Sequence, residues 1–381
     1  MGDIQRIAMK RGYETLSIVG RRKPFSDMPC IKVGDFFSFG MHVIITTLFD
    51  RQGFGSRFET GRIVSILRKE KPDIVHLHNL HGYYLNLPIL FQYLTEEFDG
   101  KVFWTFHDCW PMTGHCAYFT AVGCERWQQE CGNCPNKKIY PISLFKDNST
   151  NNFIEKRNIF CNLKNLTIIV PSEWMANIVK RSYMGRYPVK VINNGIDVKT
   201  FRYTEPTEEF YRDYHIDKDR KMILGVASVW DKRKGLNDFI HLSDIIPNDY
   251  QIVLVGLTSG QIKRLPQNIT GITRTENSAN MAMLYSKAVV FMNPSLEESF
   301  SLVTVEALSC GTPVVVLDTS AVKELVSDGA GIVLSKHEPQ DYIDAIEKLV
   351  SRGLTRTDVS KTAQKYNVED YGERVLELYE E

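Results

Sequence analysis

The chain has 381 residues, and its 46 basic residues balance 46 acidic ones, so the formal net charge is zero. This length suits two domains, and a content of 43% hydrophobic and 24% charged residues is typical of a soluble globular protein. The balanced charge argues against a nucleic-acid partner. No apolar run reaches the length of a membrane span, which favours a cytoplasmic enzyme.

The first half of the chain alternates short β-branched runs with amphipathic helical segments. Three buried strands are predicted, at Asp73–Leu77, Val102–Phe106 and Leu166–Val170. A helix is predicted over residues 87–98, between the first two strands. Ser172 stands where it can cap the helix that begins at Glu173.

The second half repeats this alternation after a polar and charged connection at residues 200–220. Strand–helix alternation in both halves predicts an α/β fold with two doubly wound parallel sheets. We expect an N-terminal domain over residues 1–200, a second domain over 201–365, and a closing helix over 366–381 that packs back toward the first domain. Ligands bind such sheets at the carboxyl ends of the strands, here in the cleft between the domains.

Two glutamates, Glu298 and Glu306, lie eight positions apart in the segment Leu296–Val316. Glu298 follows a predicted buried strand and Glu306 lies two turns into a predicted helix, so the turn between them offers backbone N–H groups to an anion. A carboxylate cannot hold the phosphate itself, but it can accept hydrogen bonds from sugar hydroxyls beside it. From the spacing alone, a capping glutamate followed by a surface glutamate is an equally good interpretation.

Four of the eight cysteines are close in sequence, at Cys116, Cys124, Cys131 and Cys134. The last two have the spacing of a zinc knuckle, whereas the other intervals are unusual. A structural zinc site and free or buried thiols are equally favoured, ahead of disulfides. In none of these interpretations is a cysteine a nucleophile.

The sequence also resembles a known family. "NPSLEESFSLVTVEALSCGTPVVV" is similar to the E-x7-E signature of the retaining GT-B glycosyltransferases of family 4. "VPSEWMANIVKRSYMGRYPVKVINNGID" resembles that family's Ser-Glu helix and the turn after it, "GVASVWDKRKGLNDFI" its phosphate-binding segment, and "WTFHD" the motif with its N-domain histidine. "DIVHLHNLHGYYLN" and the cysteine segment resemble a bacterial subgroup that includes colanic-acid-type polysaccharide enzymes. The resemblance covers nearly the whole chain.

This resemblance implies two Rossmann-like domains and transfer of a hexose from a nucleoside diphosphate sugar to a polysaccharide or lipid-linked acceptor, with no cofactor needed for catalysis. It implies that Lys234 neutralises the leaving diphosphate, that Glu298 positions the sugar and that His107 assists from the other domain. The family carries an arginine five positions before this lysine, where this chain has Val229, so Arg233 is expected to replace it. The donor-binding residues implied by the resemblance are Glu306, Arg233, Ser299, Phe300, Ser301, Asn194 and Gly195.

The opening strand and glycine-rich turn of such enzymes are not recognisable in this sequence. A sheet without its central strand is expected to be less stable and to bind phosphate less well. The alternative function is therefore an N-terminally shortened, inactive scaffold or binding protein of the same fold.

Two further segments allow more than one interpretation. The phenylalanine-rich stretch Phe36–Phe58 is expected to pack as a helix on the N-terminal sheet, with peripheral contact to the inner membrane face as the alternative. His76, His78 and His81 resemble a metal triad, but no carboxylate accompanies them. Shaping the acceptor side of the site is the favoured role.

Overall fold

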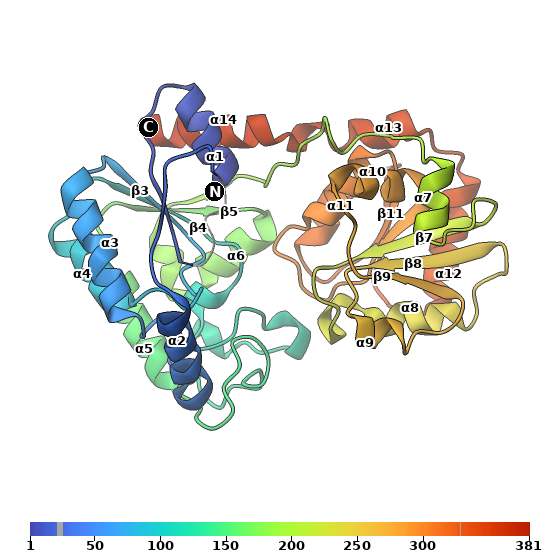
Figure 1. Ribbon diagram of the computed structural model, residues 1–381. Helices are drawn as coiled ribbons and strands as arrows, with labels where there is room; N and C mark the ends of the chain where they lie inside the picture. The colour runs from blue at the N-terminus through green and yellow to red at the C-terminus, as the bar shows by residue number, and fades with distance from the viewer. Residues whose placement is uncertain (21–25, 328) are drawn as a thin grey trace. The chain divides into compact units, whose positions relative to one another are not determined.

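The computed structural model describes residues 1–20, 26–327 and 329–381, and the chain forms two compact units (Figure 1). Unit 1 comprises Met1–Asn193 together with Tyr371–Glu381, and unit 2 comprises Asn194–Asp370. The C-terminal segment therefore belongs to unit 1, although the chain reaches it from unit 2.

The described part of unit 1 holds a four-stranded parallel sheet in the order β3-β4-β5-β6 and a separate parallel pair, β1-β2. Its strands are β1 (Ser17–Val19), β2 (Cys30–Lys32), β3 (Ile74–His78), β4 (Lys101–Thr105), β5 (Leu166–Val170) and β6 (Val189–Val191). The three strands predicted in this half are confirmed, each within one residue. β3 forms one edge of the larger sheet.

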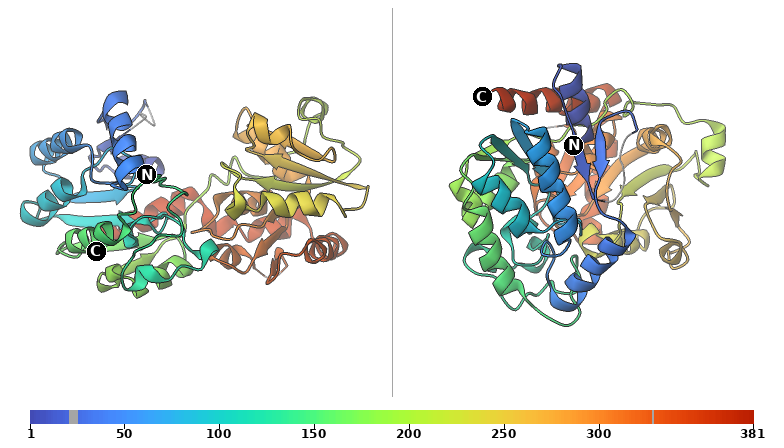
Figure 2. Two further views of the ribbon diagram at one scale, coloured as in Figure 1. Left: turned by 90° about the horizontal axis from the view of Figure 1, so that it is seen from below. Right: turned by 60° about the vertical axis from the view of Figure 1, so that its left-hand side comes forward.

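Helices lie on both faces of the larger sheet of unit 1 (Figure 2). They are α1 (Gly2–Lys10), α2 (Phe36–Phe49), α3 (Arg57–Glu70), α4 (Leu87–Glu96), α5 (Ser149–Phe160), α6 (Glu173–Arg181) and, after the passage through unit 2, α14 (Val368–Glu380). Helix α6 begins where the Ser172 side chain accepts a hydrogen bond from the backbone N–H of Met175 at 3.1 Å, so the predicted cap is confirmed.

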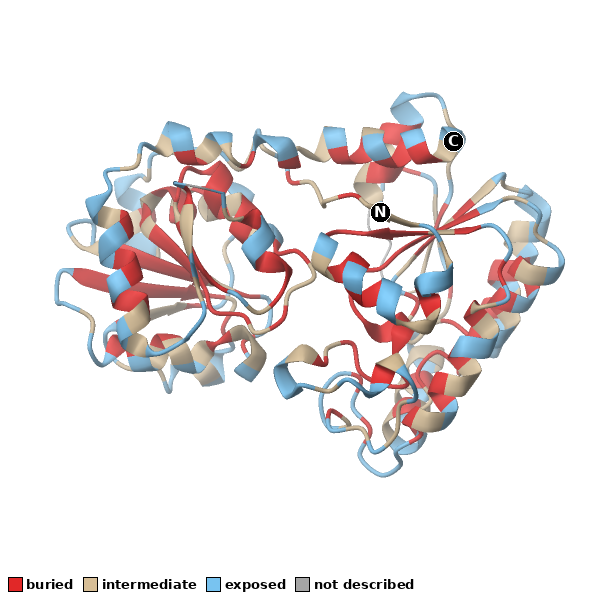
Figure 3. Ribbon diagram, turned by 180° about the vertical axis from the view of Figure 1, so that it is seen from behind, coloured by how far each residue is buried: buried red, intermediate tan, exposed pale blue. Residues whose placement is uncertain are grey.

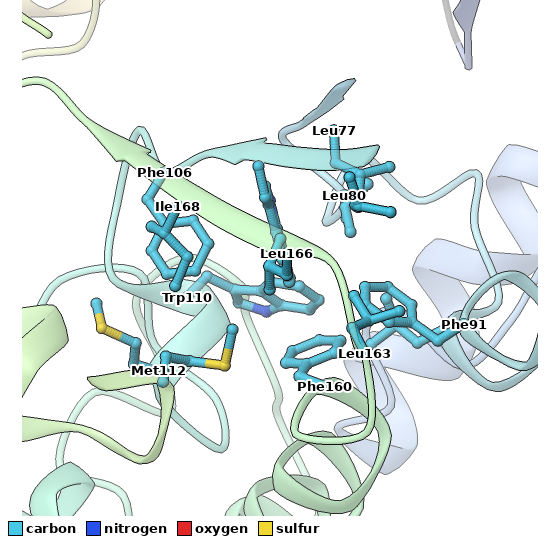
Figure 4. Close-up of a cluster of buried hydrophobic side chains, with 14 of the residues drawn as sticks. Leu77, Leu80, Phe91, Phe106, Trp110, Met112, Phe160, Leu163, Leu166 and Ile168 are labelled. Atoms are coloured by element: carbon cyan, nitrogen blue, oxygen red, sulfur yellow. The ribbon is translucent and has the colours of Figure 1, made fainter. Parts of the chain in front are cut away.

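Successive side chains of β4 and β5 point to opposite faces of the sheet, so the core of unit 1 is divided between these two faces. Trp104 of β4 faces a cluster that contains Phe91 of α4 and Phe160 of α5, and the rings of these two phenylalanines lie 4.7 Å apart (Figure 4). The neighbouring Phe103 faces the opposite cluster, in which residues of α1 and α14 cover the sheet. Both faces are therefore closed by hydrophobic packing.

Unit 2 holds a parallel sheet of six strands in the order β12-β11-β10-β7-β8-β9, with the strand interiors buried (Figure 3). The strands are β7 (Lys221–Val226), β8 (Tyr250–Val255), β9 (Ile269–Ile272), β10 (Ala288–Asn293), β11 (Val314–Leu317) and β12 (Gly331–Leu334). The helices are α7 (Glu208–Asp213), α8 (Leu236–Ser243), α9 (Ser259–Ile262), α10 (Ser278–Lys287), α11 (Leu302–Ser309), α12 (Pro339–Ser351) and α13 (Arg356–Lys361). The predicted α/β fold with parallel sheets is confirmed.

The strand order of unit 2 reverses at the centre of its sheet. From β7 the chain proceeds to one side through β8 and β9, and it then returns to place β10 on the other side of β7, followed by β11 and β12. The loops that leave β7 and β10 therefore diverge to opposite faces of the sheet. In open α/β sheets, ligands bind at the carboxyl ends of the strands at such a switch point.

The expectation that Phe36–Phe58 packs on the sheet is wrong for most of α2. Of this helix only His42 and Thr46 are buried, because these two residues, four positions apart, form the narrow stripe that faces the protein. Phe36 is 90% exposed and Phe37 is 77% exposed. None of the helices in the described ranges combines the length and apolar character needed to cross a bilayer.

Replacing Leu376 of α14 by alanine is predicted to destabilise unit 1. Leu376 is 1% exposed and packs against Ile7 and Ala8 of α1, so truncation leaves a cavity that costs about 2–5 kcal/mol. Urea unfolding followed by circular dichroism measures the change. The matched control is Glu377→Ala on the exposed face, expected within about 0.5 kcal/mol of the parent. Equal effects of the two substitutions would contradict the packing of α14 on α1.

Candidate active site

The turn after β10 leads into helix α11, whose first residue, Leu302, is exposed. Asn293, the last residue of β10, donates from Nδ2 to Ser301 Oγ and to Thr304 Oγ1, both at 3.0 Å, and so folds the turn back over the strand end. Ser301, directly before α11, has a left-handed φ of 101° and makes no side-chain capping bond. Helix N–H groups that lack a side-chain cap, together with the helix dipole, attract an anion.

Two of the predicted catalytic side chains meet beside this turn. Lys234 Nζ lies 2.5 Å from Glu298 Oε1, and the two side chains are only 17% and 13% exposed. Lys234 lies in the short 3-10 turn after β7, and Glu298 lies in the loop after β10, so the ion pair joins the two strand ends of the switch point. Because few water molecules can screen them, these charges act strongly on any ligand that reaches this position.

Backbone geometry fixes Lys234 in this place. The Asp231 carboxylate accepts a hydrogen bond from the backbone N–H of Lys234 at 3.0 Å and so caps the short 3-10 turn. The turn then ends at Gly235 with a φ of +73°, and a Cβ added there would lie 2.5 Å from Cγ of Pro294. Only glycine allows the two turns to approach this closely.

Arg233 fastens the turn after β7 to the turn after β10. Its Nη1 donates to the carbonyl oxygen of Glu297 at 3.0 Å, and its own carbonyl oxygen accepts a hydrogen bond from the N–H of Leu296 at 2.8 Å. The structure therefore places Arg233 beside Lys234 and Glu298, and its role as a second cation for the donor stays a prediction. It also gives Arg233 a positioning role that the sequence did not reveal.

Glu306 lies in α11 and is held by a tyrosine. Tyr285 of α10 donates its hydroxyl hydrogen to Glu306 Oε2 at 2.8 Å. Burial raises the pKa of the Glu306 carboxyl above its usual value, and the hydrogen bond from Tyr285 opposes this only in part. Sequence reasoning missed Tyr285, because nothing in the spacing of α10 indicates which side chain reaches α11.

The other predicted donor residues of unit 2 have different surroundings. Phe300 is 2% exposed and its ring packs edge-on against Tyr366 at 5.5 Å, so only its backbone can face a ligand. Ser299 is half-buried in the turn before α11. Asn194 and Gly195 begin unit 2, and the adjacent Ile196 pairs with residues 366–368, in a segment remote in sequence from the turn before α11.

His107 of unit 1 belongs to a short row of histidines at the ends of β3 and β4. Its Nε2 lies 3.1 Å from Nδ1 of His78, and His78 in turn lies against His76, with ring centroids 4.2 Å apart. Burial lowers the pKa of His107 to about 4 and that of His76 to about 3. At neutral pH these rings are therefore uncharged and can exchange hydrogen bonds.

His81 does not join the other two residues of the suspected triad. Its Nε2 lies 2.8 Å from Asp108 Oδ2 and its Nδ1 lies 2.9 Å from the Tyr140 hydroxyl. Asn79, with a φ of +34°, turns the chain away directly after β3, so the alternation that aligns His76 with His78 ends before His81. Burial of Asp108 acts to raise the pKa of its carboxyl, but the nearby His81 outweighs it and the pKa is lowered.

The four clustered cysteines lie in the loop between β4 and α5, and all are free thiols. Across the described residues, no three histidine, cysteine, aspartate or glutamate side chains already stand in an arrangement that could hold a metal ion.

Comparison with known families agrees with this geometry. The model for "Glycosyltransferase Family 4" matches residues 10–200, and that for "Glycosyl transferases group 1" matches residues 220–352. The chain belongs to glycosyltransferase family 4. The resemblance found in the sequence is thereby confirmed, as is the expectation that the protein is a glycosyltransferase.

Curated members of the family are similar over long stretches. A putative colanic acid biosynthesis glycosyl transferase of Escherichia coli (strain K12) is 25% identical over 350 residues, which cover 89% of this chain and 82% of the relative. A processive diacylglycerol alpha-glucosyltransferase of Acholeplasma laidlawii is 26% identical over 225 residues, or 56% of this chain and 67% of the relative.

Solved structures share the fold of this family 4 chain. Sucrose-phosphate synthase from Thermosynechococcus elongatus superimposes with a TM-score of 0.71 at 18% identity, over 99% of this chain and 91% of the other. The Anabaena protein HepE, in complex with UDP and glucose, gives a TM-score of 0.67 at 17% identity, over 99% and 95%. At these identities the likeness shows the fold alone, which is the GT-B fold expected from the sequence.

Glu306→Gln is predicted to raise the thermal midpoint at neutral pH. The pKa of Glu306 is raised in the folded chain, so its protonated form stabilises the fold. This contribution is complete below the usual carboxyl pKa of 4.5 and is lost as the pH rises through the raised pKa. Glutamine removes this loss.

A series of thermal melts from mildly acidic to neutral pH measures the difference between variant and parent. It is expected to shrink as the pH falls toward 4.5. The control is Glu298→Gln, whose partner Lys234 would lose its counter-charge, so no gain is expected there. A pH-independent difference for Glu306→Gln would contradict a raised pKa.

Proposed function

We propose that this family 4 enzyme transfers a hexose from a nucleoside diphosphate sugar to a growing polysaccharide or a lipid-linked acceptor, with retention of the anomeric configuration. The observation that carries the donor part is the buried Lys234–Glu298 pair, which lies beside the open start of α11 at the switch point of unit 2. A nucleotide sugar needs a cation for its diphosphate and a carboxylate for its sugar hydroxyls, and this pair offers both.

The diphosphate is bound by charge. Lys234 and Arg233 supply the cations, and the backbone N–H groups of the turn Ser299–Ser301 and of the first turn of α11 supply further donors. Because Lys234 is already beside Glu298, it need not be ordered when the donor binds. The negative charge that develops on the leaving phosphate then meets a cation that is fixed in advance.

The sugar and the ribose are bound by the two glutamates. Glu298 accepts hydrogen bonds from hydroxyls of the transferred hexose, and Glu306 accepts them from the ribose, with Tyr285 fixing the orientation of its carboxylate. Asn194 and Gly195 complete the donor site on the strength of the family motif. His107, uncharged at neutral pH, donates a hydrogen bond to the sugar or phosphate.

Retention follows from attack on the face that the diphosphate leaves. The bond between the anomeric carbon and the phosphate oxygen breaks, and its electron pair stays on that oxygen. The acceptor hydroxyl oxygen bonds to the same face of the anomeric carbon, and its proton passes to the departing phosphate oxygen. No separate general base is needed, because the phosphate takes the proton and Lys234 stabilises the resulting diphosphate.

An exposed apolar surface on unit 1 supports the proposal of a lipid-linked acceptor. The surface comprises the exposed side of α2, led by Phe36 and Phe37, and the loop 139–146, whose Leu144 N–H donates to the Thr47 carbonyl of α2 at 2.9 Å. Ile142, Leu144 and Phe145 of this loop are exposed. An apolar patch of this kind, with Lys137 and Lys138 directly before the loop in sequence and Lys146 at its end, suits the surface of an anionic bilayer. The names of two relatives, one assigned to colanic acid biosynthesis and one called a diacylglycerol alpha-glucosyltransferase, are consistent with such acceptors.

Lys234→Ala is predicted to weaken nucleotide binding by roughly 10–100-fold, the equivalent of losing one charge-assisted hydrogen bond of about 1.5–3 kcal/mol. Calorimetric titration with UDP, GDP and ADP identifies the base, and transfer assays with the matching sugars identify the hexose. The control is Lys232→Ala, which removes an exposed lysine from the same turn and should leave binding unchanged. Absence of binding by every nucleotide, or equal behaviour of the two variants, would overturn the donor site.

The double substitution Phe36→Ser and Phe37→Ser is predicted to weaken binding to anionic vesicles by roughly tenfold or more, since each fully buried phenylalanine contributes on the order of 1.5–3 kcal/mol. Flotation with phosphatidylglycerol vesicles measures the change, and phosphatidylcholine vesicles separate the contribution of charge. Val229→Ser, at a 63% exposed position in unit 2, is the matched control. If the parent chain binds neither vesicle type, the proposal that this apolar surface contacts lipid is refuted.

A further inference from the structure

The four clustered cysteines of unit 1 line one small pocket. Its walls are formed by Cys116, Cys124, Cys131 and Cys134 together with His115, Phe119 and Trp127, among others. The free volume inside is about 10 Å³, roughly the room that a single water molecule or ion takes. Thiols that are 8, 7 and 3 positions apart in sequence are thus brought to one place by the fold.

Two buried polar atoms in the wall of this pocket lack partners. His115 is 2% exposed, and its Nδ1 lies 2.5 Å from Asp50 Oδ1, whereas its Nε2 has no hydrogen-bond partner in the described chain. The indole Nε1–H of Trp127, also 2% exposed, has no partner there either. Buried donors are nearly always satisfied, so both point to something that the pocket holds.

Groups that can interact with sulfur lie around the cysteines. The backbone N–H of Gly114 donates to Cys131 Sγ at 3.3 Å, and the side chains of Cys116 and Cys134 are neighbours. The fully buried Lys156 donates from Nζ to the carbonyl oxygens of Trp110 and Thr113, at 2.8 and 3.0 Å. Burial lowers the pKa of Lys156 to about 7, and Cys131 and Cys116 are among its electrostatic neighbours, so negative charge on these sulfurs would favour its ammonium form.

We propose that Cys116, Cys124, Cys131 and Cys134 bind one zinc ion, and that His115, as an imidazolium whose Nδ1–H donates to Asp50, donates its Nε2–H to a coordinated sulfur. Each thiol gives up its proton to solvent on binding, so the centre carries two negative charges that Lys156 helps to balance. The thiols do not yet stand in a coordinating arrangement, and they would turn inward about their Cα–Cβ bonds to reach the ion. Four sulfur donors favour zinc over magnesium or calcium.

A metal here would stabilise a long loop that lacks strands and α-helices. Between β4 and α5, residues 106–148 form no strand or α-helix and contain only short 3-10 turns. The loop begins with His107 and Asp108 and also carries Tyr140, whose hydroxyl bonds to His81. Zinc would therefore fix the chain around His107, and this inference does not depend on which sugar or acceptor the enzyme uses.

The test is the metal content of the full-length protein, purified without chelators and measured by inductively coupled plasma mass spectrometry. We expect about one zinc per chain, with near-complete loss in Cys131→Ser and Cys134→Ser and full retention in the controls Cys30→Ser and Cys161→Ser, which lie outside the pocket. If a cysteine variant fails to fold, parent protein grown in cobalt should still show thiolate-to-cobalt charge-transfer absorption.

His115→Asn tests the second part of the proposal. Zinc should remain bound at the same stoichiometry but be released to a competing chelator roughly 10–100-fold more readily, as for the loss of other partners of metal ligands. Unchanged release would remove His115 from the proposal. A zinc-free parent protein, whether its four thiols titrate freely or intact mass shows them joined as disulfides, would overturn the metal site altogether.

Discussion

The ion pair between Lys234 and Glu298 is the interaction on which the account of this molecule depends. It is largely buried, and a buried pair persists only if both partners are held where they can compensate the loss of hydration. Here the backbone provides that constraint. Asp231 caps the turn of Lys234, Gly235 lets it approach Pro294, and Arg233 bonds to the loop that carries Glu298.

The pair stands where it does because of the strand order. β7 and β10 are neighbours in the sheet, but their connections leave in opposite directions, so the space beyond their carboxyl ends is open to a ligand. α11 adds a helix start without a side-chain cap at the same place, and Glu306 adds a carboxylate whose ionisation is opposed by burial. A chain optimised for stability alone would keep neither feature, which supports the donor site proposed for this turn.

Much of this was predictable from the sequence. The alternation that places Trp104 and Phe103 in opposite clusters predicted the strands, and Ser172 predicted the start of a helix. These signals are readable because they act between near neighbours in the chain. The Glu298–Glu306 turn and Lys234 were found through a family motif. The contact at 2.5 Å between Lys234 and Glu298 could not be predicted in this way. It joins residues 64 positions apart, which meet because β7 and β10 are neighbours in the sheet.

Other features were predicted wrongly or not at all, and the structure shows the physical reasons. Asn79 turns the chain out of the strand register, so His81 pairs with Asp108 instead of joining His76. α2 is apolar on most of its sides, and its buried stripe consists of the polar His42 and Thr46, so composition does not tell which side of the helix the protein covers. The partner of Glu306, Tyr285, comes from another helix, and no local sequence pattern indicates this contact.

The most direct test of the central claim is a crystal structure of the chain with UDP, GDP or ADP, whichever it binds. The account predicts that the diphosphate lies at the carboxyl ends of β7 and β10, with Lys234 Nζ and the first N–H groups of α11 within hydrogen-bonding distance of its oxygens, and with Glu306 against the ribose. A nucleotide bound elsewhere, with the Lys234–Glu298 pair untouched, would contradict it.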